Sequence, residues 1–217
     1  MRKETRKYYF SVEGETEKWY LEWLQKTISS DSRSKYNVKF DFKIERDPVS
    51  RLKNLSPIGN IEITHIFDME SEATDHEEGF RSTLERMKEA QRLGKNIVYK
   101  LGYSNLTFEL WMILHKADCN GGKTNCKKYI PDLNNAYGEK FKDLQEYKNE
   151  DNFKKRILQN LTIEDVISAV KRSQAIMKVN EEICKLKNHE GYEYYKENPS
   201  LTVWEIIDKI LRECGIM

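Results

Sequence analysis

The sequence predicts an α/β protein with a largely parallel sheet flanked by helices, followed by a mainly helical C-terminal part. In the first half, short β-branched and aromatic runs alternate with amphipathic segments of helix length, which is typical of a parallel sheet. In the second half, helical periodicity extends almost to the C-terminus. The chain has 217 residues, of which 38% are hydrophobic, and this suffices for a sizeable core.

The first half contains segments with the composition of strands and of helices. One helix is expected to begin at Thr16, with Trp19, Tyr20 and Trp23 at helical spacing. This spacing favours a core position for the aromatic side chains over a base-stacking platform. A second helix is expected to end at Gly94. The expected strands are residues 8–12, 38–44, 61–67 and 96–101, the second helix is 77–93, and 48–57 is a turn-rich segment.

The second half has the periodicity of helices. The apolar run 105–115 predicts a buried helix with Ser104 or Asn105 as its cap. Ser200 follows a turn and is the expected N-cap of the last helix. The other helices are expected at residues 153–158, 163–186 and 201–211.

The length allows one large domain, or a core with an appendage. A boundary, if the chain has one, is expected near residues 115–125. We interpret residues 116–217 as a helical elaboration packed on a core formed by residues 1–115, and not as a separate domain.

Composition and charge argue against several classes of protein. Charged residues make up 34% of the chain, too many for a secreted disulfide scaffold or a membrane protein, and no run reaches the ~20 apolar residues of a membrane helix. The formal net charge of +1 indicates no global attraction to nucleic acid but leaves a local basic groove open. Without a signal peptide, the four cysteines are expected to be reduced and the protein cytoplasmic.

Carboxylates follow two of the expected strands. Glu13 and Gly14 end the first strand, and Asp68 and Glu70 end the third. Ligand sites in open parallel sheets lie at the carboxyl ends of strands, and side chains two apart in a strand point the same way. Grouped carboxylates suit Mg²⁺, which prefers oxygen ligands. The other reading is that these acids face solvent and that Glu17, one helical turn after Glu13, favours the helix N-terminus.

Four segments resemble motifs of the Toprim domain as it occurs in RloB-like proteins and in the overcoming-lysogenization nucleases. The resemblance implies a Toprim-like fold and cleavage of DNA or RNA that depends on Mg²⁺ or Mn²⁺. RloB-like proteins are associated with restriction loci and with abortive-infection phage defence. The segments, in the order of the family, are FSVEGETEKWYLEWL (10–24), IFDME (66–70), SNLTFELWMILH (104–115) and NPSLTV (198–203).

The resemblance assigns roles to single residues. Glu13 matches the motif glutamate, a general acid/base or metal ligand, and Asp68 matches a metal ligand. Glu17 matches an additional acid of the first motif, and Glu109 matches the glutamate of the Phe-Glu-x-Trp helix. Glu70 is a departure, because the family usually has an aspartate there; the longer side chain can still bind metal but would place the ion differently.

Glu109 and several basic residues have two readings each. A carboxylate inside an apolar helix needs a partner, so Glu109 either pairs with Lys100 or Arg172 or belongs to the site. Lysines after the Gly-Gly loop, and Arg172 in a long helix, are either solvated or contact phosphates. We predict Lys123, Lys127 and Arg172 as phosphate contacts. Lys128 lies next to Lys127 in the loop.

A zinc site is the weaker metal hypothesis. His115, Cys119 and Cys126 could be ligands, but their spacing fits no common zinc pattern.

Two functions remain open from the sequence. The first is a Mg²⁺-dependent endonuclease acting on DNA or RNA. The second is a non-catalytic, Toprim-like binding or regulatory subunit that works with an ATPase encoded nearby. The oligomeric state is not predicted.

Overall fold

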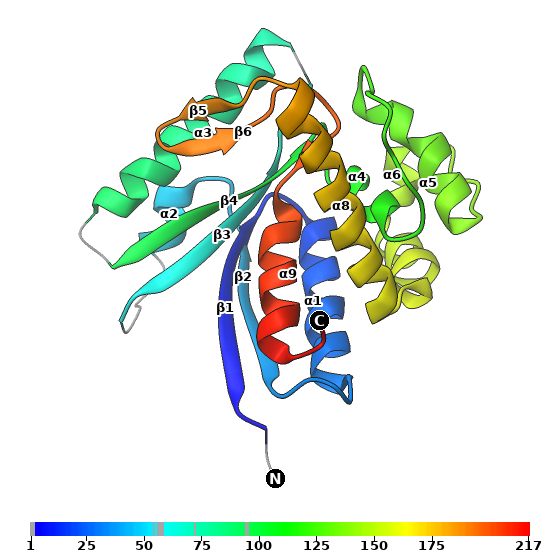
Figure 1. Cartoon of the computed structure of the whole chain (residues 1–217), viewed down its shortest axis with the longest axis horizontal. Helices are drawn as coiled ribbons and strands as arrows, with labels where there is room; N and C mark the ends of the chain where they lie inside the picture. The colour runs from blue at the N-terminus through cyan, green and yellow to red at the C-terminus, as the bar shows by residue number, and fades with distance from the viewer. Residues whose placement is uncertain (1–2, 54, 56–58, 72, 94–95) are drawn as a thin grey trace.

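Figure 1 shows a twisted sheet with helices on both faces and a further group of helices beside its upper edge. This computed structural model describes residues 3–53, 55, 59–71, 73–93 and 96–217. The predicted α/β class with a largely parallel, helix-flanked sheet is confirmed. The expected helix end at Gly94, and positions 54, 56 and 57 of the turn-rich segment, lie outside the described residues.

The sheet has the strand order β2-β1-β3-β4-β7. Its first four strands are parallel, and only the short β7 runs antiparallel to its neighbour. The register pairs Val12 with Ile66 and Asp68 with Ser104, so the carboxyl ends of β1, β3 and β4 meet at one edge. The strands are β1 (Thr5–Val12), β2 (Asn37–Ile44), β3 (Ile61–Asp68), β4 (Ile97–Asn105) and β7 (Ser200–Leu201).

One face of the sheet is covered by α2 (Pro48–Lys53), α3 (Thr74–Arg92) and a hairpin of β5 (Lys187–His189) and β6 (Tyr192–Tyr194). Phe67 of β3 stacks on Phe80 of α3, with ring centroids 4.9 Å apart. The hairpin was not predicted from the sequence. Its two-residue turn, Glu190-Gly191, has positive φ at both positions, the geometry that closes tight hairpins.

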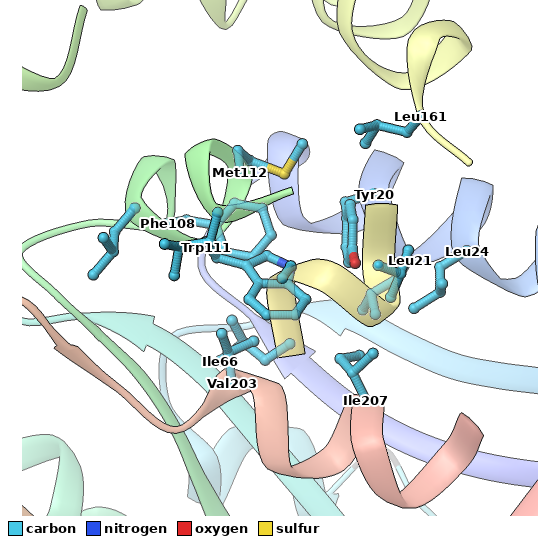
Figure 2. Close-up of a cluster of buried hydrophobic side chains, with 14 of the residues drawn as sticks. Tyr20, Leu21, Leu24, Ile66, Phe108, Trp111, Met112, Leu161, Val203 and Ile207 are labelled. Atoms are coloured by element: carbon cyan, nitrogen blue, oxygen red, sulfur yellow. The ribbon is translucent and has the colours of Figure 1, made fainter. Parts of the chain in front are cut away.

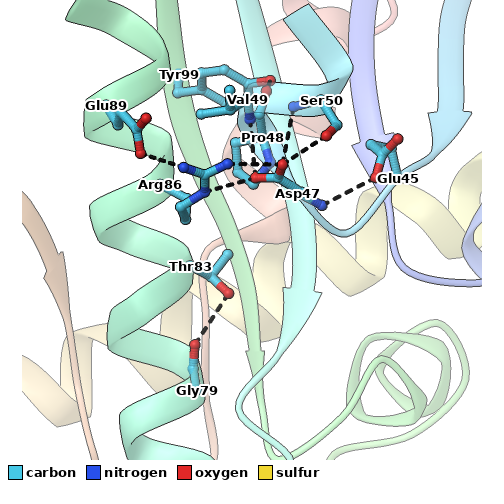
Figure 3. A network of polar contacts seen from close by, with 10 residues as sticks. All are labelled: Glu45, Asp47, Pro48, Val49, Ser50, Gly79, Thr83, Arg86, Glu89 and Tyr99. Carbon is cyan, nitrogen blue, oxygen red and sulfur yellow. Dashed lines mark hydrogen bonds and ion pairs between the residues drawn. The ribbon is translucent and has the colours of Figure 1, made fainter.

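A polar network fixes α2 against α3 (Figure 3). The Asp47 carboxylate accepts hydrogen bonds from the backbone N–H groups of Val49 and Ser50, so it caps the helix N-terminus. Arg86 of α3 donates to both oxygens of the same carboxylate, at 2.9 Å each. The segment predicted as turn-rich therefore begins with a short helix.

The other face carries α1 (Glu15–Ser30) and α9 (Val203–Cys214), with α4 (Glu109–Leu114) and α8 (Ile163–Ile183) packed beside them. Figure 2 shows the shared core, in which Tyr20 and Trp111 lie among aliphatic side chains of several elements. Both are fully buried, and Trp19 is buried as well, which confirms the predicted core position for these aromatics, whereas Trp23 is only partly buried and packs against the core. One continuous cluster of buried side chains runs from Phe10 to Ile216.

The segment between α4 and α8 folds into short helical pieces (Figure 1). They are η1 (Cys126–Tyr129), α5 (Ile130–Tyr137), α6 (Leu144–Tyr147), α7 (Glu150–Asn152), η2 (Phe153–Ile157) and η3 (Leu158–Asn160).

Among the described residues no helix is long and apolar enough to cross a membrane. All four cysteines are free thiols.

Two predicted helix starts are wrong. Ser104 and Asn105 do not cap a helix, because they extend β4 and pair with Leu201 and Ser200 of β7. The helix of this region starts only at Glu109. For the same reason Ser200 is not the N-cap of α9, a position held by Thr202. Pairing with a distant strand outweighed the local apolar and capping pattern in both places.

Candidate functional site

Glu13 and Asp68 meet at the carboxyl edge of the sheet. Glu13 directly follows β1 and Asp68 is the last residue of the adjacent parallel strand β3. The backbone N–H of Asp68 donates to Oε2 of Glu13 at 3.2 Å. The two strand-end acids that the sequence singled out are therefore held together by the register of the sheet.

Glu17 joins them from the first turn of α1. Its side chain is buried, and one carboxylate oxygen accepts a hydrogen bond from the Thr16 hydroxyl at 3.0 Å. Gly14 makes room for this carboxylate, since a Cβ at Gly14 would lie 3.0 Å from Oε2 of Glu17. Any larger residue at Gly14 would crowd that oxygen.

Glu109 completes a group that we call the acidic cluster: Glu13, Glu17, Asp68 and Glu109. The hydroxyl of Thr107 links two members, because its Oγ1 lies 3.0 Å from Oδ2 of Asp68 and also contacts Oε2 of Glu109. One hydroxyl hydrogen can serve only one of these oxygens at a time. Thr107 thus bridges the carboxylates of Asp68 and Glu109, a role that no sequence pattern indicated.

Lys148 supplies the positive charge of the acidic cluster. Its Nζ lies 3.0 Å from Oε1 of Glu109, whose side chain is 0% exposed, while Lys148 itself keeps 40% of its side chain exposed. The expected pairing of Glu109 with Lys100 or Arg172 is wrong. Arg172 instead pairs with Asp118 and donates to the carbonyl of Leu114.

Burial and like charge raise the pKa values of Glu13, Glu17 and Asp68. Burial raises the pKa of Glu13 to about 7, with further contributions from Glu17 and Glu70, against the lowering effect of the Asp68 N–H. Burial and the neighbouring carboxylates also raise the pKa of Asp68 well above its usual value and that of Glu17 above its own. The cluster therefore carries more negative charge than Lys148 alone balances when every acid is ionised.

Glu70 lies at the rim and not within the acidic cluster. The premise that the strand persists through Glu70 is wrong, because β3 ends at Asp68. Glu70 adopts φ 63°, the left-handed region that non-glycine residues rarely occupy, and its side chain is 58% exposed. Its N–H donates to the carbonyl of Leu106 and its carbonyl accepts from the Cys126 thiol, so two loops fix this conformation.

The acidic cluster opens into a recess of about 620 Å³, which we call the acidic pocket. Asp68 is the cluster member in its wall, with Thr107 and Lys148 beside it and Glu70 at the rim. Lys127 also lines the pocket, so one predicted phosphate contact is brought to the acids. Lys123 is not, because its Nζ forms an ion pair with Asp132 at 2.5 Å.

A histidine that the sequence did not single out lies at the same rim. His76 contacts the Ser71 hydroxyl through Nδ1 at 2.6 Å, and its Nε2 lies 3.5 Å from Oε2 of Glu70. Ser71 and His76 both line the acidic pocket. The side chain of His76 therefore forms part of the wall of the acidic pocket, beside Glu70.

The acidic cluster has the donor type that Mg²⁺ prefers. Mg²⁺ is usually held by one or two carboxylates together with waters and substrate phosphates. Glu13 and Asp68 provide such a pair, in contact across two strand ends. Within the described part of the chain, no group of three or more His, Cys, Asp or Glu side chains has the geometry of a ready-made metal site.

The zinc hypothesis has no support in the geometry. Both ring nitrogens of His115 are engaged, one with the Tyr20 hydroxyl and one with the carbonyl of Trp111. Cys119 lies against Asp132, and Cys126 lies against the carbonyl of Glu70. The three candidate ligands thus have separate partners.

Comparison with known proteins gives one family. No curated protein and no solved structure matches the chain. The family model described as "RloB-like protein" matches residues 8–210, which is nearly the whole chain and includes every member of the acidic cluster. On this match, the chain belongs to the family of RloB-like proteins.

Proposed function

We propose that this protein is a metal-dependent endonuclease that hydrolyses phosphodiester bonds in DNA or RNA. The observation that carries the proposal is the meeting of Glu13 and Asp68 at adjacent parallel strand ends, where Asp68 opens into a pocket with Lys127 and Lys148. Carboxylates for a cation and ammonium groups for phosphates in one recess are what such a reaction requires.

Each residue of the site has a distinct part in the proposal. Asp68 and Glu13 hold Mg²⁺ or Mn²⁺, with Glu17 behind them and Glu70 at the rim. When bound, the metal ion polarises the phosphodiester and stabilises the leaving oxygen. Glu13 also serves as the general acid/base. Lys148 neutralises Glu109 and faces the acidic pocket, where its ammonium group can contact the substrate phosphate.

The proposal includes a role in phage defence, following the association of RloB-like proteins with restriction loci and abortive infection. Its support is the family membership together with the acidic cluster. A cell expressing the native chain should limit phage growth, and a cell expressing Asp68→Asn should not.

A cleavage assay tests the enzymatic proposal. Native protein, Glu13→Gln and Asp68→Asn are incubated with single-stranded and duplex DNA and RNA, with Mg²⁺, Mn²⁺ or a chelator. We expect metal-dependent cleavage that falls by roughly 10³-fold in either variant, the scale of several kcal/mol of lost transition-state stabilisation. Asp151→Asn is the matched control, because this exposed carboxylate forms its ion pair with the exposed Lys155. Equal cleavage by all four proteins would refute the assignment.

A non-catalytic subunit is the second candidate, favoured by two specific observations. Lys148 already neutralises the most buried acid of the cluster, and Glu70 is held at the rim in a left-handed conformation. In this reading the acidic cluster is structural and the protein acts through an ATPase partner. No cleavage by the native chain, with or without an ATPase encoded beside it, would favour this candidate.

A further inference from the structure

A second recess adjoins the acidic pocket. It has a volume of about 780 Å³, and Asn125 and Lys127 belong to the walls of both. We call it the basic recess, because Lys128 and Lys142 complete its charged rim. Its walls come from η1, from the start of α5 and from the loop and helix around α6. A bound polymer, such as a nucleic-acid strand, can therefore extend from one recess into the other past residues 125–127.

The rim of the basic recess carries uncompensated positive charge. Lys127, Lys128 and Lys142 are exposed and form no ion pair with the described residues. The one acid of the lining, Asp143, uses its carboxylate to cap α6 through the N–H of Glu146. Other lysines of this region differ, since Lys123 and Lys148 are each paired with an acid. Unpaired ammonium groups on the rim of one recess suit the binding of phosphates.

The basic recess also has an apolar lining, which we call its floor. Ile130, Pro131 and Leu144 supply it, and Gln145 belongs to the same recess. A duplex offers such a floor only phosphates and sugars, whereas an unpaired nucleotide can lay the face of its base on it. The volume falls within the range of about 300–1,000 Å³ found for sites of small ligands, which accommodates a nucleotide.

We propose that the basic recess binds an unpaired nucleotide next to the scissile phosphate, so that the substrate is single-stranded or looped nucleic acid. The base lies on the floor formed by Ile130, Pro131 and Leu144, and its flanking phosphates lie between Lys127 and the pair Lys128 and Lys142. This inference rests on the proposed nuclease function and adds the class of substrate to it.

Binding measurements that need no cleavage test the inference. The full-length Asp68→Asn protein is titrated, in chelator, with a fluorescent single-stranded oligonucleotide, with the corresponding duplex and with a hairpin of the same sequence. We expect the single strand and the hairpin loop to bind about tenfold more tightly than the duplex, because only unpaired bases reach the apolar floor.

Variants locate the binding on the protein. In the Asp68→Asn background, Lys128→Gln with Lys142→Gln should weaken single-strand binding about tenfold and reduce the salt slope by about 1.4, the effect of two phosphate contacts. Lys178→Gln with Lys185→Gln removes the same charge from exposed positions of and after α8 and should change neither. Leu144→Gln, checked for folding by circular dichroism, should weaken single-strand binding and leave duplex binding unchanged.

The outcomes separate this inference from the nuclease proposal. Equal binding of duplex and single strand, or equal losses in the two double-lysine variants, overturns the inference even when cleavage depends on Asp68. Lysine-dependent binding of single strands without any cleavage by the native chain supports the basic recess and refutes the nuclease.

Discussion

The acidic and the basic residues of the candidate site come from different parts of the molecule. The acidic cluster is built by strand ends and by the helix starts that follow them, within residues 13–109. The lysines come from short helical pieces and from the loops that join them, within residues 123–148. The pairing of the parallel strands thus sets the positions of Glu13 and Asp68. The segment between α4 and α8 places the ammonium groups of Lys127 and Lys148 beside them. We infer that metal binding belongs to the first part and recognition of phosphates to the second.

The two parts are joined by the ion pair of Lys148 and Glu109 as well as by hydrogen bonds such as that from the Cys126 thiol to the Glu70 carbonyl. Because Glu109 is buried, removal of the ion pair should have the largest effect on stability. Lys148→Met leaves the buried carboxylate of Glu109 without a cation and should cost up to about 3 kcal/mol in the free energy of unfolding. Adding Glu109→Gln removes the unpaired charge and should restore at least half of the loss. Urea denaturation measures both.

A matched control makes this prediction specific. Lys155 and Asp151 form an ion pair on the surface of the same segment, so Lys155→Met should cost less than about 1 kcal/mol. A loss in Lys148→Met no larger than in Lys155→Met would mean that the ion pair with Glu109 does not join the two parts energetically.

Acid should destabilise the sheet through His65, which lies in the core away from the acidic cluster. Burial lowers the pKa of His65 to about 3, and its Nδ1 contacts the Ser11 hydroxyl. Because the folded pKa lies below the unfolded value, the stabilising contribution is complete above pH ~6.5 and is lost as the pH falls toward 3. We expect His65→Gln to remove roughly 1.4 kcal/mol per pH unit from the pH dependence of unfolding below pH 6.

The readout is the unfolding free energy of native protein and His65→Gln at a series of pH values. His115 is also buried, with its pKa lowered to about 4 by burial, so some pH dependence should survive in the variant. Superimposable curves for the two proteins would contradict the assignment of acid sensitivity to His65.

A smaller effect is expected at the face of the sheet that α2 and α3 cover. Asp47→Ala removes the cap of α2 and both hydrogen bonds from Arg86, and should cost about 1–2 kcal/mol in the free energy of unfolding. Glu89→Ala removes only the exposed partner of Arg86 and should cost less than about 0.5 kcal/mol. Because neither residue touches the acidic cluster, metal-dependent cleavage at a temperature well below unfolding should stay at the native level in both variants.

The smallest effect is expected at Glu70. Glycine adopts its positive φ without cost, so Glu70→Gly should raise the free energy of unfolding by up to about 1 kcal/mol. If the carboxylate at the rim assists the metal, the same variant should cleave more slowly. A variant that is both less stable and equally active would show that neither the backbone conformation nor the carboxylate of Glu70 matters as we infer.

The acidic part of the site could be predicted from the sequence, whereas in the basic part the sequence indicated Lys127 but not Lys148. Glu13 and Asp68 follow β-branched runs, and parallel pairing then brings strand ends together by a general rule. Lys148 lies in a charged stretch without periodicity, so nothing local indicates its contact with Glu109. Glu70 was misplaced because a pattern of alternation does not reveal where a strand stops. Ser104 and Asn105 were misassigned because their pairing with β7 depends on residues nearly a hundred positions away.

We infer that the acidic cluster holds a divalent cation, and a titration with Mn²⁺ measures such binding without any cleavage. Free Mn²⁺ is followed by its paramagnetic resonance signal in solutions of native protein, Asp68→Asn and Asp151→Asn. We expect native protein and Asp151→Asn to bind Mn²⁺ saturably, and we expect folded Asp68→Asn to lose this binding. Equal binding by all three proteins, or no saturable binding by the native chain, would contradict it.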